Sequence, residues 1–474
     1  MRGRMDFGSP IPITPCIACA IRSHKLCSGG GAESYLGPRR MDSRLGSFRS
    51  MSHVFVRRIE RKWVERFAAA ALFVMLAGRA PSDLRCAADQ PPQPPAAGSA
   101  PADTTDSVST QATERRRGRR EPQEVEGVDH FRRESALLTA FWGRPMEIEA
   151  GVVLPPGHDP AAKNTPVCYS IHGFGGSHRE AWRAGPDLRR KMAEGDYPRM
   201  IYVYLNAQFP MGHHEFADSV NNGPWGKALT EEFIPALEST YGAAGISEGR
   251  FVTGHSSGGW SSLWLQVNYP TFFNGTWSTA PDAVDFRDFT GINVYEFKNA
   301  FVDPQGNPIQ LVRGNDGDWV QTVKDYVEGE FARSDYGGQF ASFDAVFSPR
   351  GEDGRPMPLF DRKTGEIHAD AARAWERYDI RLILKNGWPT LQPRLAGKLH
   401  IFVGSKDTYR LEGAVLLLQQ ELASLGSDAE FRIAEDRHHG NLGMPHETWW
   451  PAGLRTHIHS AMWARWKAAA PASK

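Results

Sequence analysis

Residues 251–259, which read FVTGHSSGG, constrain the fold of this chain more than any other stretch. The residues before the turn are apolar and typical of a buried strand. After the turn, apolar residues recur at the i, i+3, i+4, i+7 spacing of one helix face, so the pattern predicts strand, tight turn, helix. These apolar positions are Trp260, Leu263, Trp264 and Val267.

Gly254, Ser256 and Gly258 have the spacing G-x-S-x-G at this turn. A nucleophile on a sharp elbow needs nearly side-chain-free neighbours, because strand and helix approach each other there. Ser256 would then project its hydroxyl above the sheet, and the Ser257 N–H, at the start of the helix, would face a substrate carbonyl oxygen. A G-x-S-x-G string alone usually marks only a turn, but the strand–turn–helix context favours a nucleophile.

Short strand-like runs alternate with helical segments through most of the chain after residue 140. This alternation is typical of an α/β fold with a mostly parallel central sheet and helices on both faces. The predicted strands are residues 146–154, 167–171, 200–205, 251–253, 275–278, 398–403 and 431–434. The predicted helices are residues 180–193, 228–239 (kinked or restarted at Pro235), 369–384, 411–425 and 458–466.

Composition divides the chain into distinct parts. Residues 1–50 lack periodicity and indicate a disordered or over-extended N terminus. Residues 51–88 combine a basic start, a short apolar run and small residues, as an export signal does. Residues 89–125 are rich in Pro, Ala and Ser and end in a basic run, which predicts a disordered linker. Residues 126–474 form the predicted catalytic domain, in which residues 286–395 interrupt the alternation as an insertion before the acid-bearing strand.

The N-terminal pattern also predicts where the protein resides. We expect export to the periplasm or the extracellular space. The apolar run is short for a membrane span, which needs about twenty residues. If that run stays uncleaved it would tether the protein to a membrane, and this alternative remains open.

A serine hydroxyl becomes a strong nucleophile only when a base accepts its proton, so Ser256 requires a histidine and a carboxylate. Asp407 follows the predicted strand 398–403, and His439 follows the strand 431–434. Both positions lie at the carboxyl edge, where open α/β sheets carry their chemistry. Asp407 could instead cap the helix that starts near residue 411, and His438 is the alternative base.

The developing oxyanion needs a second donor besides the Ser257 N–H. Residues 172–176, which read HGFGG, follow an early strand, and the Phe174 backbone N–H is the candidate. Glycine-rich loops also bind phosphates, but the chain has no G-K-[ST] after such a loop and no G-x-G-x-x-G that opens a helix, so we do not expect nucleotide binding.

The charge, the cysteines and the histidine spacing argue against a nucleic-acid partner, a disulfide-dependent fold and a metal site. The formal net charge is zero, so nothing indicates a nucleic-acid partner. Of five cysteines only Cys168 lies in the predicted domain, so the fold does not depend on a disulfide there. His213, His214 and Glu215, with Asp218 near, lack the HExxH spacing of a zinc site, so we predict no metal and no cofactor.

Together these motifs resemble the α/β-hydrolase superfamily, and within it the putative esterase family of esterase D-like and feruloyl-esterase-like enzymes. The resemblance covers about residues 140–445. It is carried by the HGFGG loop, by residues 216–235, by the elbow, by residues 403–411 (VGSKDTYRL) and by residues 437–440 (RHHG). The last of these implies that His439 is the base, with His438 where the family often has aspartate.

The resemblance and the residues together predict an exported serine carboxylesterase that works through an acyl-enzyme and acts on a small-molecule or polysaccharide-linked ester. The predicted catalytic residues are Ser256, Asp407 and His439. The candidate substrate-pocket residues are His172, Gly175, His255, Trp225 and His438. The alternatives are a peptidase or acyltransferase of the same fold, or an inactive carbohydrate-binding homologue.

Overall fold

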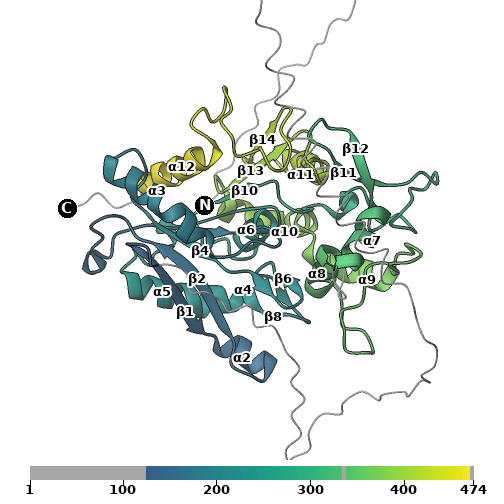
Figure 1. The fold of residues 1–474 in the computed structure, drawn as a ribbon, viewed down its shortest axis with the longest axis horizontal. Helices are drawn as coiled ribbons and strands as arrows, with labels where there is room; N and C mark the ends of the chain where they lie inside the picture. Colours follow the sequence, from purple (N-terminus) through teal and green to yellow (C-terminus); the bar gives the residue numbers. More distant parts are fainter. Residues whose placement is uncertain (1–123, 334–337, 470–474) are drawn as a thin grey trace, which may run out of the picture. The chain divides into compact units, whose positions relative to one another are not determined.

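The computed structural model describes residues 124–333 and 338–469, and their centre is an eight-stranded sheet in the order β1-β2-β4-β3-β9-β10-β13-β14 (Figure 1). The two pairings that involve β2 are antiparallel, and all the others are parallel. The strands are β1 (Val128–Glu134), β2 (Glu147–Val153), β3 (Val167–Ile171), β4 (Ile201–Leu205), β9 (Arg250–His255), β10 (Thr276–Thr279), β13 (Leu399–Gly404) and β14 (Glu430–Ala434). The mostly parallel sheet of an α/β-hydrolase is therefore confirmed.

Helices cover both faces of the sheet. Neighbouring residues of β3 show this, since successive side chains of a strand point to opposite faces. On one face, the Tyr169 hydroxyl in β3 donates a hydrogen bond to Glu238 of α5 (Ile234–Tyr241) at 3.0 Å. On the other face, Cys168 lies 3.7 Å from His459 of α12 (Leu454–Ala469). Helix α3 (Glu180–Glu194) lies beside α12 on this second face (Figure 1).

Most predicted elements are present within a residue or two of their expected ends. The helix predicted at residues 228–239 is a π-helical stretch, Ala228–Phe233, followed by α5. Pro235 stands just after this π-helical stretch, so the predicted kink or restart at Pro235 coincides with the change of helix type. The other elements before β10 are α2 (Ala136–Trp142), α4 (Trp225–Lys227), α6 (Ser257–Asn268), the short strands β5 (Gln208–Phe209), β6 (Gly212–His213), β7 (Asp218–Ser219) and β8 (Gly223–Pro224), and 3-10 turns at Pro160–Ala162 and Ser247–Gly249.

One predicted helix, residues 369–384, is wrong. The chain forms α9 (Ala369–Trp375), a 3-10 turn (Glu376–Tyr378) and then a separate helix, α10 (Ile380–Leu395). Asp379 adopts extended backbone, and its side chain accepts a hydrogen bond from the Leu382 N–H at 3.0 Å. An N-cap of this kind begins a new helix, so the apolar spacing runs across two helices.

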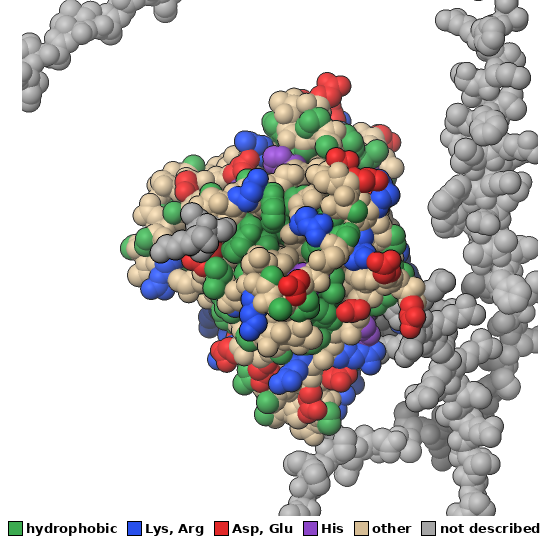
Figure 2. Space-filling view, turned by 90° about the vertical axis from the view of Figure 1, so that its left-hand side faces the viewer, with side chains coloured by type: hydrophobic (Ala, Val, Ile, Leu, Met, Phe, Trp, Pro, Cys, Tyr) green, Lys and Arg blue, Asp and Glu red, His purple; other side chains and the backbone are tan. Residues whose placement is uncertain are grey.

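The segment between β10 and β13, predicted as an insertion, also contains a small antiparallel pair. The remaining elements are the 3-10 turn Phe286–Asp288, β11 (Gln310–Arg313), β12 (Trp319–Thr322), α7 (Val323–Arg333), α8 (Gly338–Phe347) and, after β13, α11 (Leu411–Ser424). On the face of the molecule shown in Figure 2, basic and acidic side chains are interspersed.

The predicted N-terminal extension, export signal and nearly all of the linker lie outside the described residues, so these interpretations stay predictions. Within the described ranges, no helix is both long enough and apolar enough to span a bilayer.

Candidate active site

Ser256 occupies a sharp turn between the end of β9 and the start of α6. Its backbone has φ 61° and ψ −126°, a region that non-glycine residues rarely adopt. The Ser256 N–H donates to the Thr279 carbonyl at 3.0 Å, which fixes the turn to the neighbouring strand. Strained backbone of this kind clusters at functional sites and is the conformation expected of a nucleophile elbow.

The two glycines of the elbow are required by close backbone packing. A Cβ on Gly254 would lie 2.0 Å from the Gly258 carbonyl oxygen. A Cβ on Gly258 would lie 2.0 Å from the carbonyl oxygen of Ile171, at the end of β3. Neither contact is sterically allowed. Both glycines are therefore needed for the close packing of the helix against the strands.

The acid and the base predicted from the sequence meet at the carboxyl edge of the sheet. His439 Nδ1 lies 2.8 Å from Asp407 Oδ2, and Asp407 is fully buried. The other oxygen, Oδ1, accepts the Tyr409 N–H at 2.9 Å. The N-cap of α11 is Arg410, so Asp407 orients the histidine and does not cap that helix.

Electrostatics around His439 favour its protonated form. Burial opposes the charge, but the hydrogen bond to Asp407 and the negative charges of Asp407 and Asp282 together raise the pKa of His439 above its ordinary value. The ring of His255 packs against His439 with centroids 4.4 Å apart. Burial lowers the pKa of His255 to about 3, so this neighbour stays neutral beside the base.

Sequence reasoning missed Asp282, a third carboxyl group at this edge. The Ser256 hydroxyl donates to Asp282 Oδ1 at 3.5 Å, and the hydrogen bonds of the described residues include none between Ser256 Oγ and His439. Asp282 Oδ2 also accepts from the Ser257 hydroxyl at 2.6 Å and from Gln339 at 3.2 Å. Burial and the neighbouring Glu215 raise the pKa of Asp282 to about 7. The one sequence feature that could have identified Asp282 is its position shortly after the end of β10.

The predicted oxyanion loop lies against the elbow. A Cβ on Gly173 would lie 3.0 Å from the Ser256 Cβ and 3.7 Å from its Oγ. His172 Nε2 accepts the Ala207 N–H at 2.9 Å, so its Nδ1 carries the proton and donates to the Gly173 carbonyl at 2.8 Å. The Ser257 N–H belongs to the first turn of α6, where N–H groups have no intrahelical partner.

The five candidate pocket residues do not gather in one place. Gly175 and Trp225 line a cavity of about 530 Å³ together with Phe174. The His255 ring packs on the His439 ring, and His172 hydrogen-bonds to the Gly173 carbonyl. His438 Nδ1 accepts the Gly440 N–H at 3.2 Å, so this side chain shapes the loop that carries His439.

The histidines weighed as metal ligands have other contacts. His213 Nε2 bonds the His172 carbonyl at 2.9 Å, and His214 stacks on Trp225 with centroids 3.7 Å apart. Glu215 is buried and accepts from the Ser261 hydroxyl at 2.6 Å. In residues 124–333 and 338–469, this stretch does not form a group of three neighbouring ligand atoms.

The strand order, the elbow and the buried acid–base pair define an α/β-hydrolase. Residues 143–455 match the family model described as "Putative esterase", and the chain belongs to that family. No curated protein matches the chain.

The chain also matches several solved structures at low sequence identity. A ferulic acid esterase is 14% identical, with 71% of this chain and 96% of that chain covered and a TM-score of 0.42. The S-formylglutathione hydrolase of Agrobacterium tumefaciens is also 14% identical, with 73% and 96% covered and a TM-score of 0.41. A fluorophosphonate-binding serine hydrolase of Staphylococcus aureus is 12% identical, with 72% and 98% covered and a TM-score of 0.42.

Proposed function

We propose that the protein is a serine carboxylesterase that cleaves esters through an acyl-enzyme. The observation that carries the proposal is the hydrogen bond between His439 and the buried Asp407, which stands at the same sheet edge as the strained Ser256. A nucleophile, a base and a carboxylate that orients the base form the minimal set for acyl transfer.

In the proposed reaction, the Ser256 side chain rotates from Asp282 toward His439, whose Nε2 accepts the hydroxyl proton. Ser256 Oγ then bonds the carbonyl carbon of the ester. The N–H groups of Phe174 and Ser257 would bind the oxyanion, and each such donor typically lowers the barrier by about 3 kcal/mol.

Collapse of this intermediate breaks the bond to the alkoxy oxygen, and His439 returns its proton to the departing alcohol. Water, activated by the same histidine, then hydrolyses the acyl-enzyme. Asp407 stabilises the imidazolium in both halves of the reaction.

On the side of Asp282, the space beside the nucleophile favours a small acyl group, whereas a separate cavity of about 400 Å³ lies along Phe174 and His255. Asp282 and Tyr409 line a narrow cavity of about 20 Å³, and the Tyr409 ring lies 5.0 Å from that of His439. This is room for about one water molecule. Aromatic side chains supply much of the wall, namely Phe289, Tyr326, Phe340 and Phe343. An acetyl group fits this space better than a hydroxycinnamoyl group, which would require the wall to open.

The proposed substrate is therefore a short-chain ester, and the export signal predicted from residues 51–88 supports an acetylated polysaccharide outside the cytoplasm. Export and the polysaccharide are parts of the proposal that depend on the N-terminal sequence alone.

The test is hydrolysis of acetyl, long-chain and hydroxycinnamoyl esters by the wild type, Ser256→Ala and the control Ser247→Ala. We expect acetyl esters to react fastest and Ser256→Ala to lose about 10⁶-fold in kcat. The control should stay close to wild type. Wild-type rates in Ser256→Ala would exclude the mechanism, whereas faster turnover of aminoacyl amides, or faster turnover on adding an acceptor alcohol, would identify a peptidase or an acyltransferase.

A further inference from the structure

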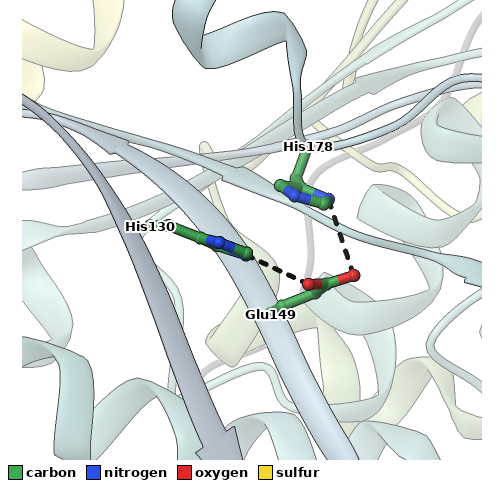
Figure 3. A group of neighbouring side chains, drawn as sticks. All are labelled: His130, Glu149 and His178. Atoms are coloured by element: carbon green, nitrogen blue, oxygen red, sulfur yellow. Dashed lines mark hydrogen bonds and ion pairs between the residues drawn. The ribbon is translucent and has the colours of Figure 1, made fainter. Parts of the chain in front are cut away.

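A group of metal-ligand side chains lies on the sheet away from the proposed triad. It consists of His130 on β1, Glu149 on β2, and His178 in the loop that leads into α3 (Figure 3). Figure 3 shows the two imidazole rings converging on the carboxylate from different elements. Of the residues that the structure describes, no other group offers three such atoms within reach of one ion.

The fold brings these residues together through strand pairing and one glycine. In the antiparallel β1–β2 pair, Gly151 is opposite His130, and Glu149 is two positions along the same strand and face. A Cβ on Gly151 would lie 2.4 Å from the Ala181 Cβ and 2.8 Å from the His178 carbonyl oxygen. Only glycine allows the start of α3 to approach the strands closely enough to seat His178.

The distances between the ligand atoms suit a small divalent ion. His130 Nε2 lies 3.0 Å from Glu149 Oε2, and His178 Nδ1 lies 3.9 Å from Glu149 Oε1. All three ligand atoms fall within 4.8 Å of one another. Zinc bonds of about 2.0–2.1 Å place tetrahedral ligand atoms about 3.3 Å apart, so adjustments of up to about 1.5 Å would complete the geometry.

His178 supplies a second, independent observation. This residue is only 6% exposed, and within the described residues its Nδ1 has no hydrogen-bond partner. A buried polar atom without a partner normally costs free energy, and a bound ion is one of the ordinary explanations for such an atom. The atom faces the carboxylate across the site, as a metal ligand would.

The surroundings resemble those of a metal site in other ways. Asn206 donates to Glu149 Oε1 at 2.8 Å, and such outer hydrogen bonds orient ligating carboxylates. The edge of Trp182 packs on both imidazole rings and limits their rotation. All three residues of the group line a cavity of about 560 Å³, which leaves a coordination position open to water or a ligand.

The Arg132 guanidinium lies where it would compete with a bound cation for Glu149. Its Nε lies 3.4 Å from His130 Nε2 and 3.6 Å from Glu149 Oε2, while the side chain is half exposed. A bound cation would repel this guanidinium toward solvent. The arginine therefore serves as the counter-charge of Glu149 when no metal is bound.

From this geometry we propose that His130, Glu149 and His178 bind one divalent zinc ion, with a fourth position open to the cavity. Two imidazoles and a carboxylate with one open position are a donor set that catalytic zinc sites use. The bound ion would join β1 and β2 to the segment that follows the HGFGG loop. The site is separate from the proposed ester chemistry, and its test does not depend on that chemistry.

The experiment is calorimetric titration of the chelator-treated full chain with Zn²⁺, together with the absorption spectrum of the Co²⁺ form. We expect one zinc per chain with Kd below about 1 µM. Loss of an outer partner alone costs about 10–100-fold in affinity, so His130→Ala and Glu149→Gln should each weaken binding by at least about 100-fold. Arg132→Gln should tighten binding because it removes the competing cation.

His446→Ala is the matched control, since this half-buried histidine stacks on Trp449 away from the group, and it should bind zinc as the wild type does. Glu149→Gln keeps the shape of the side chain, and His130 is partly exposed, so both variants should fold. The proposal is wrong if zinc binds no tighter than about 100 µM. It is also wrong if both ligand variants bind like wild type, or if Co²⁺ shows an intense near-ultraviolet thiolate band, which would assign the ion to cysteines.

Discussion

The carboxyl edge of the sheet and its β1–β2 end both gather histidine and carboxylate side chains, but the chain assembles them differently. At the carboxyl edge, Ser256, Asp407 and His439 each stand on a loop directly after a parallel strand. At the β1–β2 end, His130 and Glu149 stand inside strands and become neighbours only through antiparallel pairing. Local sequence patterns therefore mark the first site, whereas long-range register creates the second.

The largest expected loss of kcat comes from substituting His439, and the adjacent His438 is its control. His439→Ala removes the base that contacts Asp407, and we expect kcat for an acetyl ester to fall by about 10⁶-fold. His438→Ala removes a side chain that bonds only its own loop, and its kcat should fall by less than about tenfold. Equal losses in the two variants would contradict the assignment of the base.

Asp407→Asn should have the next largest effect. An amide can hold the imidazole in the wrong tautomer and cannot stabilise the imidazolium, and the analogous change elsewhere costs about 10⁴-fold in kcat. Asp436→Asn is the matched control, because this exposed carboxylate pairs only with Lys406 on the surface. Single-turnover and steady-state rates of both variants would check the prediction. Similar rates for the two would remove Asp407 from the mechanism.

The pH dependence of kcat/KM should reflect the negative charge around His439. The base must be neutral to accept a proton, and its pKa is raised above 6.5, so kcat/KM should rise with pH through a midpoint above 6.5. Asp407 and Asp282 raise this pKa, and the neighbouring His255 stays neutral. Asp282→Asn removes one negative charge and should move the midpoint to lower pH. A midpoint that moves upward would contradict this electrostatic account.

The smallest expected effect concerns the other end of the sheet. Gly151→Ala forces its new Cβ against Ala181, and overpacking of this kind typically costs about 1–3 kcal/mol of stability. Gly329→Ala, in α7, meets no close contact and should stabilise the protein by up to about 1 kcal/mol. Urea unfolding of the two variants measures both values. If Gly151→Ala keeps wild-type stability, the close approach of α3 to β2 is not required.

Much of the carboxyl edge was predictable because its residues lie within a few positions of a recognisable strand end. The G-x-S-x-G spacing locates Ser256, and the loops after β13 and β14 locate Asp407 and His439. Asp282 also follows a strand, but a single aspartate after Ala280 and Pro281 has no distinguishing spacing. Its importance comes from the hydroxyl groups of Ser256 and Ser257, which contact it in the folded chain.

The β1–β2 end was not predictable by the same means. The strand β1 was not expected at all, and His130 and His178 are separated by residues of several other elements. No spacing motif joins them to Glu149, because the register of the strands and the absence of a side chain at Gly151 bring them together. The wrong prediction of one helix at residues 369–384 has a related cause, since apolar periodicity does not reveal the cap at Asp379.

The most direct test of the central claim is mass spectrometry of the protein after reaction with a fluorophosphonate. We expect one adduct per chain, on the peptide that contains Ser256, and none in the Ser256→Ala variant. An adduct on any other residue, or no adduct on the folded, active wild type, would contradict the assignment of Ser256 as the nucleophile.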